Sequence, residues 1–216
     1  MQSSDFDSFP NLLYFESASR LTKHSVSLPA EKTDIRPKLL ETRENLDAAV
    51  ADQMSGAILS NLRNLEPFVR AAVIHSYVSS KKNEVDTRWL IADALKAGKR
   101  VVVPVTNREH HRLDHSEILS LDDLAPGTFG ILEPAIRRAI GLDIVDVVIV
   151  PVVGVDRRGN RIGYGKGYYD RFLKLVDKPK VALAYAFQVI EQVPPDPEDV
   201  SVDFVVTEKE VIGCAR

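Results

Sequence analysis

Apolar residues between positions 35 and 65 recur at helical spacing. They return mostly every three, four or seven positions, at Ile35, Leu39, Leu46, Val50, Met54, Ala57, Ile58, Leu62 and Leu65. Residues spaced in this way share one face of a helix. The pattern predicts one long helix that opens the folded domain and turns its apolar face toward a core.

Short apolar runs, separated by polar or glycine-containing segments, predict five strands. They lie at residues 71–78, 100–105, 146–153, 181–186 and 204–206. The run at 146–153 is apolar at almost every position, which is typical of a central strand that is covered on both faces.

Two further helices are predicted between these strands. The first begins beyond Asn83 and stops at Gly98, a residue suited to the left-handed position after a helix. It would turn Trp89, Leu90, Ala94 and Leu95 inward. The second passes through Phe172, Leu173 and Val176. Because strands alternate with helices, we expect an α/β fold, a three-layer α/β/α sandwich with a mostly parallel central sheet.

The chain length of 216 residues is sufficient for one such domain, which we place at residues 31–216. Residues 1–30 are predicted to be an N-terminal extension of unknown role. They contain Asp5, Asp7 and Glu16 and only short apolar pieces, which fits neither a secretory signal nor an acid-poor transit peptide.

Charge and cysteine content narrow the partners and the location. The net charge of −3 argues against broad nucleic-acid binding, so a small molecule is the expected partner. No apolar run approaches the ~20 residues of a membrane span, so no membrane partner is expected. The lone cysteine, Cys214, allows no intrachain disulfide and favours a cytoplasmic setting. The sequence does not indicate an oligomeric state.

A glycine-rich segment at residues 159–171 follows the central strand. Its backbone N–H groups can approach an anion because four positions lack side chains: Gly159, Gly163, Gly165 and Gly167. Interleaved cations could neutralise a polyphosphate: Arg161, Lys166 and Arg171. A flexible surface turn is the alternative. The segment lacks the Gly-Lys-Ser/Thr of a P-loop and lies too far from the strand for a Rossmann turn.

The sequence of this segment, GNRIGYGKGYYDR, resembles the G-x-R-x-G-x-G-x-G-Y-Y-D-R signature of the 5-formyltetrahydrofolate cyclo-ligases, also called methenyltetrahydrofolate synthetases. Shorter elements of that family follow in the same order from about Lys32 to Glu208. They are Lys32 with Arg36, residues 84–87 (EVDT), residues 129–134 (FGILEP), Val150 and Pro151 with Asp156, and residues 197–199 with Asp203, Thr207 and Glu208.

The resemblance implies an ATP- and Mg²⁺-dependent enzyme that turns 5-formyltetrahydrofolate into 5,10-methenyltetrahydrofolate and releases ADP and phosphate. The formyl oxygen would attack the γ-phosphorus, N10 would then attack the activated carbon, and phosphate would leave. Because the substrate supplies both nucleophiles, the protein has to align the reactants and stabilise phosphoryl charge.

The resemblance also assigns residues to this reaction. ATP would be bound by Lys32, Arg36, Arg161, Ile162, Gly163, Tyr164, Gly165, Lys166, Gly167, Tyr168 and Tyr169, of which Arg161 and Lys166 would be catalytic. Folate would contact Glu84, Tyr164, Lys166 and Tyr168. Asp170 and Asp199 would hold Mg²⁺, which prefers one or two carboxylates together with phosphate oxygens and water.

Structural roles are the alternatives for these residues. Asp170 would suit the first turn of a helix, Glu84 would suit a helix N-terminus, and Asp199 would be an ordinary loop residue. The tyrosines beside the glycines would simply pack.

Pro37 bears on Lys32, because proline clashes with the carbonyl group four residues earlier. The helix is therefore expected to begin near Asp34, which leaves Lys32 outside it and puts its contact with ATP in doubt.

His111 and His115 stand four residues apart, as in a helical zinc pair, and His110 lies beside them. They lie in a charged connector without further ligands, so we predict no metal site there. Glu133 and Pro134 are expected to be structural.

Two other functions compete with this interpretation. One is a non-catalytic module of the same fold that binds nucleotide or folate without turnover. The other is a sugar-phosphate isomerase or a coenzyme A transferase on a similar sandwich. Neither the isomerase reaction nor the transferase reaction consumes ATP.

Overall fold

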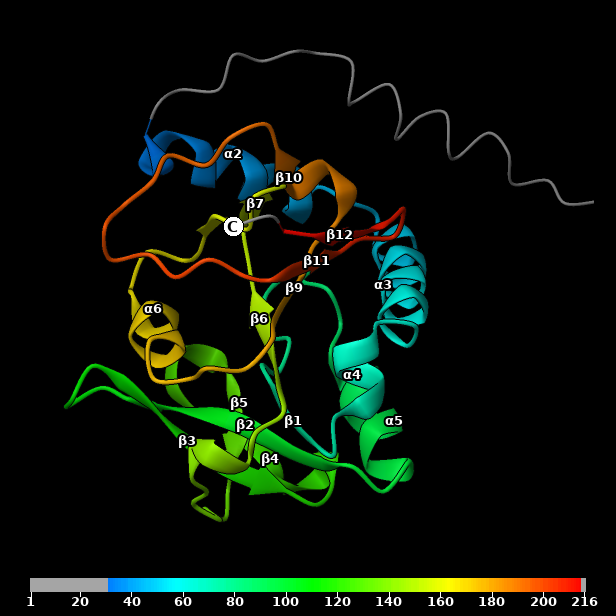
Figure 1. Cartoon of the computed structure of the whole chain (residues 1–216), viewed down its shortest axis with the longest axis vertical. Helices are drawn as coiled ribbons and strands as arrows, with labels where there is room; N and C mark the ends of the chain where they lie inside the picture. The colour runs from blue at the N-terminus through cyan, green and yellow to red at the C-terminus, as the bar shows by residue number, and fades with distance from the viewer. Residues whose placement is uncertain (1–30, 215–216) are drawn as a thin grey trace, which may run out of the picture.

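A seven-stranded sheet forms the centre of the molecule in the computed structural model, which describes residues 31–214 (Figure 1). The strand order is β12-β11-β9-β6-β1-β2-β3. The strands are β1 (Val73–Ser76), β2 (Arg100–Asn107), β3 (Arg112–Ile118), β6 (Val147–Pro151), β9 (Lys180–Leu183), β11 (Phe204–Val206) and β12 (Val211–Gly213). Only the edge strands β3 and β12 pair antiparallel to their neighbours. The predicted N-terminal extension, residues 1–30, lies outside the described residues.

Helices lie on both faces of this sheet. On one face are α3 (Ala48–Leu62), α4 (Glu66–Arg70) and α5 (Arg88–Lys96), and on the other is α6 (Tyr168–Leu173) (Figure 1). Successive residues of β6 face opposite cores, because Ile149 packs in the first core and Val148 in the second. The mostly parallel α/β fold is confirmed. Within residues 31–214 the arrangement agrees with a three-layer sandwich in which one layer contains a single short helix.

A smaller sheet lies under the first helix. It contains β7 (Gly154–Asp156), β8 (Arg161–Ile162) and β10 (Val189–Ile190), and α2 (Lys32–Glu44) packs against it through Ile35 and Leu39. The strands β4 (Leu124–Pro126) and β5 (Leu132–Pro134) form a hairpin-like pair. Short 3₁₀ turns occupy Leu121–Asp123, Thr128–Gly130, Leu142–Ile144 and Ala186–Gln188.

The single long helix predicted for residues 35–65 is wrong, because α2 and α3 are separate helices. The side chain of Asn83 donates to the carbonyl oxygens of Arg43 and Leu46 and so closes the end of α2. The carboxylate of Asp47 then accepts hydrogen bonds from the backbone N–H groups of Ala49 and Val50 and caps α3.

The predicted start of α2 is also wrong. The helix begins at Lys32, with Glu31 as N-cap, and contains Pro37. The first turn is closed by bonds from the N–H groups of Asp34 and Ile35 to the carbonyl oxygen of Glu31. Pro37 removes only one backbone donor from this helix, whereas the core contacts of α2 are retained.

Trp89 was expected to face inward, but it is 56% exposed. The buried side chains of α5 are Leu90, Ile91 and Ala94, and Trp89 lies one position outside that stripe. Gly98 has the predicted left-handed conformation, with φ of 76°. The polar segment after residue 105 contains β3, which the sequence did not indicate because an edge strand carries few apolar residues.

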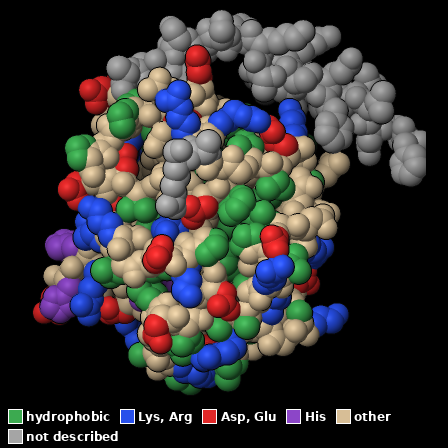
Figure 2. Space-filling model, viewed as in Figure 1, with side chains coloured by type: hydrophobic (Ala, Val, Ile, Leu, Met, Phe, Trp, Pro, Cys, Tyr) green, Lys and Arg blue, Asp and Glu red, His purple; other side chains and the backbone are tan. Residues whose placement is uncertain are grey.

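None of the helices within residues 31–214 combines the length and the apolar character that a membrane span needs. On the face shown in Figure 2, basic and acidic side chains are interspersed.

Candidate active site

A pocket of about 770 Å³ lies where the glycine-rich segment meets α2 and the loop after β1. That volume is typical of a small-molecule site. The walls come from segments far apart in the sequence: α2, residues 77–84, the β2 and β3 strands, residues 163–171 and the loop at 196–199. All the predicted site residues line it except Ile162. The side chain of Ile162 is fully buried in the small core beside Ile35 and Leu39.

Arg161 lies at the base of the pocket and is 4% exposed. One terminal nitrogen donates to Asp170 Oδ1 at 2.5 Å, and Nε donates to the carbonyl oxygen of Val200 at 3.2 Å. The N–H of Val200 donates to the same Asp170 oxygen at 3.4 Å. Arg161 therefore joins α6 to the loop that carries Asp199. Burial lowers the pKa of Arg161, and the charges of Asp170 and Asp199 oppose this shift.

Asp199 forms an ion pair with Lys32 across the pocket and also accepts a hydrogen bond from the N–H of Asp196 at 3.1 Å. The doubt about Lys32 rested on its lying outside the helix. Because α2 begins at Lys32, this side chain projects from the helix into the pocket.

Arg36 lies against the glycine-rich segment and donates from Nε to the carbonyl oxygen of Gly163 at 2.7 Å. A Cβ atom at Gly165 would lie 3.3 Å from the guanidinium carbon of Arg36, and one at Gly163 would lie 3.3 Å from Arg161. Because Gly163 and Gly165 have no side chains, Arg161 and Arg36 can lie close to the backbone in the pocket wall. Gly165 and Gly167 also have left-handed φ values of 86° and 66°, which favour glycine.

Lys166 is exposed, and its Nζ lies 3.4 Å from the centroid of the Phe129 ring. Phe129 has a positive φ of 58°, and its carbonyl oxygen accepts a hydrogen bond from Lys81 Nζ at 3.0 Å. Such a conformation is strained for an aromatic residue and is often found at binding sites. Phe129 and Lys81 were not predicted as site residues, although Phe129 lies within the family-like FGILEP run. The available signal was the position of Phe129 in that run, directly before a glycine.

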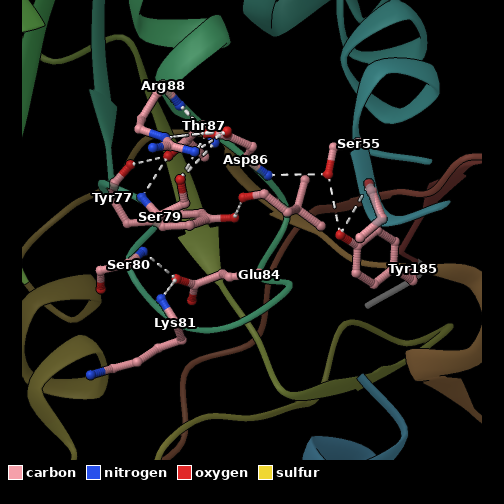
Figure 3. A network of polar contacts seen from close by, with 12 residues as sticks. Ser55, Tyr77, Ser79, Ser80, Lys81, Glu84, Asp86, Thr87, Arg88 and Tyr185 are labelled. Carbon is pink, nitrogen blue, oxygen red and sulfur yellow. Dashed lines mark hydrogen bonds and ion pairs between the residues drawn. The ribbon is translucent and has the colours of Figure 1, made fainter. Parts of the chain in front are cut away.

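Glu84 is held in the loop after β1 and not at a helix N-terminus, so that alternative is wrong. Its Oε2 accepts hydrogen bonds from the N–H groups of Ser80 at 3.0 Å and Lys81 at 3.3 Å (Figure 3). Its Oε1 accepts one from the hydroxyl of Tyr164 at 2.9 Å. The N-cap of α5 is Thr87, three residues further on.

Buried polar contacts fix the loop that carries Glu84. The Tyr77 hydroxyl donates to the carbonyl oxygen of Val85 at 3.0 Å, and the Ser79 hydroxyl donates to Asp86 at 2.9 Å (Figure 3). The N–H of Asp86 donates to the hydroxyl of Ser55 on α3 at 3.2 Å. The loop is therefore tied to α3 as well as to β1.

The two tyrosines that begin α6 differ in environment. Tyr168 lies in the pocket, with the guanidinium carbon of Arg171 5.3 Å from its ring centroid. Arg171 itself donates to the carbonyl oxygens of His111 and Lys166. The hydroxyl of Tyr169 is buried and has no partner among the described residues. Burial, and then the charge of Glu84, raise the pKa of Tyr169.

The histidines of the connector do not share a helix, because residues 112–118 form β3. His115 Nδ1 lies 3.1 Å from Nε2 of the fully buried His75, and Phe172 packs on both rings. Burial, and then His115, lower the pKa of His75; burial lowers that of His115 to about 4, with Asp114 opposing.

No group of three or more His, Cys, Asp or Glu residues suited to a metal ion occurs within residues 31–214. Glu133 is 8% exposed and accepts a hydrogen bond from the N–H of Thr106, which agrees with a structural role.

Comparison with known proteins relates this pocket to one family. Residues 29–208 match the model of the 5-formyltetrahydrofolate cyclo-ligase family. A relative from Arabidopsis thaliana, named a mitochondrial 5-formyltetrahydrofolate cyclo-ligase, is 30% identical over 86% of this chain and 77% of its own length. A 5-formyltetrahydrofolate cyclo-ligase from Mus musculus is 33% identical over 60% of this chain and 70% of its own length.

A solved structure agrees with these relatives. The 5,10-methenyltetrahydrofolate synthetase of Aquifex aeolicus superimposes with a TM-score of 0.76 and is 37% identical, covering 86% of this chain and 93% of the Aquifex chain.

Proposed function

The chain belongs to the 5-formyltetrahydrofolate cyclo-ligase family, and we propose that the pocket described above binds ATP, Mg²⁺ and folate together. The protein is an enzyme of this family and converts 5-formyltetrahydrofolate to 5,10-methenyltetrahydrofolate. The observation that supports the proposed site is the convergence of the signature segment, Lys32, Arg36, Glu84, Asp170 and Asp199 on one pocket.

The proposed ATP site is the end of the pocket between α2 and the glycine-rich segment. Lys32, Arg36 and Arg161 lie there, and their positive charge suits phosphate oxygens. Lys166 lies on the exposed rim of the pocket, where its side chain can change conformation to contact a bound ligand. In this arrangement Arg36 and Arg161 would bind and orient the phosphates, and the cations would stabilise charge on the transferred group.

Asp170 and Asp199 fit a magnesium ion bound together with phosphate. Arg161 joins the segments that carry them, and each uses only one carboxylate oxygen for its hydrogen bonds among the described residues. The second oxygen of each remains available. Two carboxylates complemented by phosphate oxygens and water are what Mg²⁺ prefers, and the bound ion would offset negative charge on the phosphates.

The proposed folate site is the end of the pocket lined by Glu84, Tyr164 and Tyr168, with Lys166 beside it. An ionised carboxylate suits the hydrogen-bond donors of a 2-aminopyrimidinone ring, and tyrosine rings can stack on it. Phe129 adds a further aromatic ring to the pocket wall.

The experiment is to follow formation of the 5,10-methenyl chromophore by absorbance with purified protein and 5-formyltetrahydrofolate. Product is expected only when ATP and Mg²⁺ are both present, with one ADP released per product. Tight binding of ATP and folate without product would identify a non-catalytic module instead. Product formed without ATP would overturn the proposed use of the nucleotide.

For the location, the cytoplasm is supported by the lone cysteine, since a protein without paired cysteines has no need of an oxidising compartment. Because one relative is named mitochondrial, fractionation of cells that express the full chain is the test. Recovery in organelles would overturn this location.

A further inference from the structure

We propose that Arg43, a residue outside the pocket wall, is a positioning residue that acts through Tyr164 on Glu84 and thereby raises the affinity of the enzyme for folate. The inference rests on the proposed function, in which Glu84 contacts the folate ring.

Arg43 lies in the last turn of α2 and is 2% exposed. One of its terminal nitrogens donates to the hydroxyl oxygen of Tyr164 at 3.0 Å, and its guanidinium carbon lies 5.8 Å from the centroid of the same ring. Its Nε is buried without a hydrogen-bond partner in the described part of the chain. A buried guanidinium with an unpaired donor is costly, so a structure that keeps it needs a compensating interaction.

Tyr164 supplies that interaction, because its hydroxyl links Arg43 to the carboxylate of Glu84 through two hydrogen bonds. Its oxygen accepts from Arg43, and its O–H donates to Glu84 Oε1 at 2.9 Å. Burial and the charge of Glu84 raise the pKa of Tyr164, so its hydroxyl keeps the proton that it donates to Glu84. A hydroxyl that accepts from a cation is polarised and becomes the stronger donor.

The carboxylate of Glu84 is therefore restrained at both oxygens. Ser80 and Lys81 donate to Oε2 and Tyr164 donates to Oε1, which fills three of about four acceptor positions of an ionised carboxylate. One position remains for a ligand. Without the bond at Oε1 the carboxylate is held at Oε2 alone, so Oε1 has more freedom to move and a ligand has to order it on binding.

The backbone of the same segment is fixed from the same helix. Arg36, seven residues before Arg43 on α2, donates to the carbonyl oxygen of Gly163 at 2.7 Å. Residues spaced by seven lie on one helix face. The helix thus holds the backbone next to Tyr164 with one arginine and the Tyr164 side chain with another.

The test compares Arg43→Met, Tyr164→Phe, their double variant and Glu84→Gln. Arg138→Met is the matched control, because Arg138 pairs with Asp123 and neither lines the pocket. KM for 5-formyltetrahydrofolate, KM for ATP, kcat and melting temperature are measured for each. Arg43→Met is expected to raise the folate KM roughly tenfold, as for a lost charged hydrogen bond, and to leave the ATP KM unchanged. Tyr164→Phe, which changes a residue of the pocket wall, is expected to raise the folate KM by at least as much.

The double variant is expected to be no worse than the more affected single variant, because both remove the same restraint. Multiplied effects would overturn the inference. If Arg43→Met fails to fold, Tyr164→Phe decides, since it retains the arginine and the ring. An unchanged folate KM in Tyr164→Phe together with a raised folate KM in Glu84→Gln overturns the role of Arg43 and Tyr164. It leaves the assignment of Glu84 to folate intact. An unchanged folate KM in Glu84→Gln overturns the assignment of Glu84 to folate, and the inference with it.

Discussion

Replacing each proposed magnesium ligand by asparagine separates its structural role from its role in metal binding. Asp170 accepts one hydrogen bond from Arg161, whose side chain is 3% exposed, whereas Asp199 pairs with Lys32 at side-chain exposures of 23% and 18%. In Asp170→Asn a buried guanidinium loses its charged partner. In Asp199→Asn the residue that loses its charged partner is Lys32, which has access to water.

The magnitude follows from these environments. A hydrogen bond to a charged group contributes about 1.5–3 kcal/mol, and Asp170 is itself 25% exposed, so the lower half of that range is expected for Asp170→Asn. At about 2–4 °C per kcal/mol for a chain of this size, its melting temperature should fall by roughly 3–9 °C. The partly exposed pair of Asp199 is closer to a surface ion pair, which contributes about 0–1 kcal/mol.

The assay is thermal unfolding of both variants, together with the rate of methenyl product formation as a function of magnesium concentration. Both variants should need more Mg²⁺ than the wild type, although only Asp170→Asn should be clearly less stable. Wild-type magnesium curves in both variants would refute the metal assignment. Equal melting temperatures would refute the argument from the burial of Arg161.

Three further predictions concern charge, backbone shape and pH. Lys166→Met should weaken ATP binding about tenfold or more in calorimetric titration with the melting temperature unchanged, because this side chain is exposed; full ATP affinity would remove Lys166 from the site. Gly165→Ala should reduce ATP affinity more than folate affinity, because its φ of 86° and the 3.3 Å approach to Arg36 force the segment to move; equal losses for both ligands would contradict this. The pKa of His115 is lowered to about 4 in the folded state, so the unfolded chain binds more protons between pH 6.5 and 4 and the protein should lose stability as the pH falls through that window. His115→Leu should flatten this dependence of the melting temperature on pH, and an unaltered slope would contradict the cause given.

The sequence predicted the sheet well because its parallel strands are buried on both faces. After the charged first residues Asp146 and Arg100, the runs at 146–153 and 100–105 are apolar without interruption, and they contain β6 and most of β2. It failed for β3, whose pairing with β2 is set by backbone hydrogen bonds and leaves an edge strand with polar side chains. It also merged α2 and α3, since the break between them is stabilised by Asn83, a residue almost forty positions further along the chain.

At the site, the motif indicated which residues come together but not what they contact without ligands. Arg161 and Lys166 are both cations within the glycine-rich segment, and both were predicted to be catalytic residues that bind ATP. In the structure Arg161 is buried against Asp170 and the loop at Val200, whereas Lys166 lies exposed on Phe129. The difference comes from partners that only tertiary structure brings near. Neutralising Arg161 should therefore disturb the magnesium loop as well as phosphate binding, whereas neutralising the exposed Lys166 should affect ligand binding and leave that loop in place.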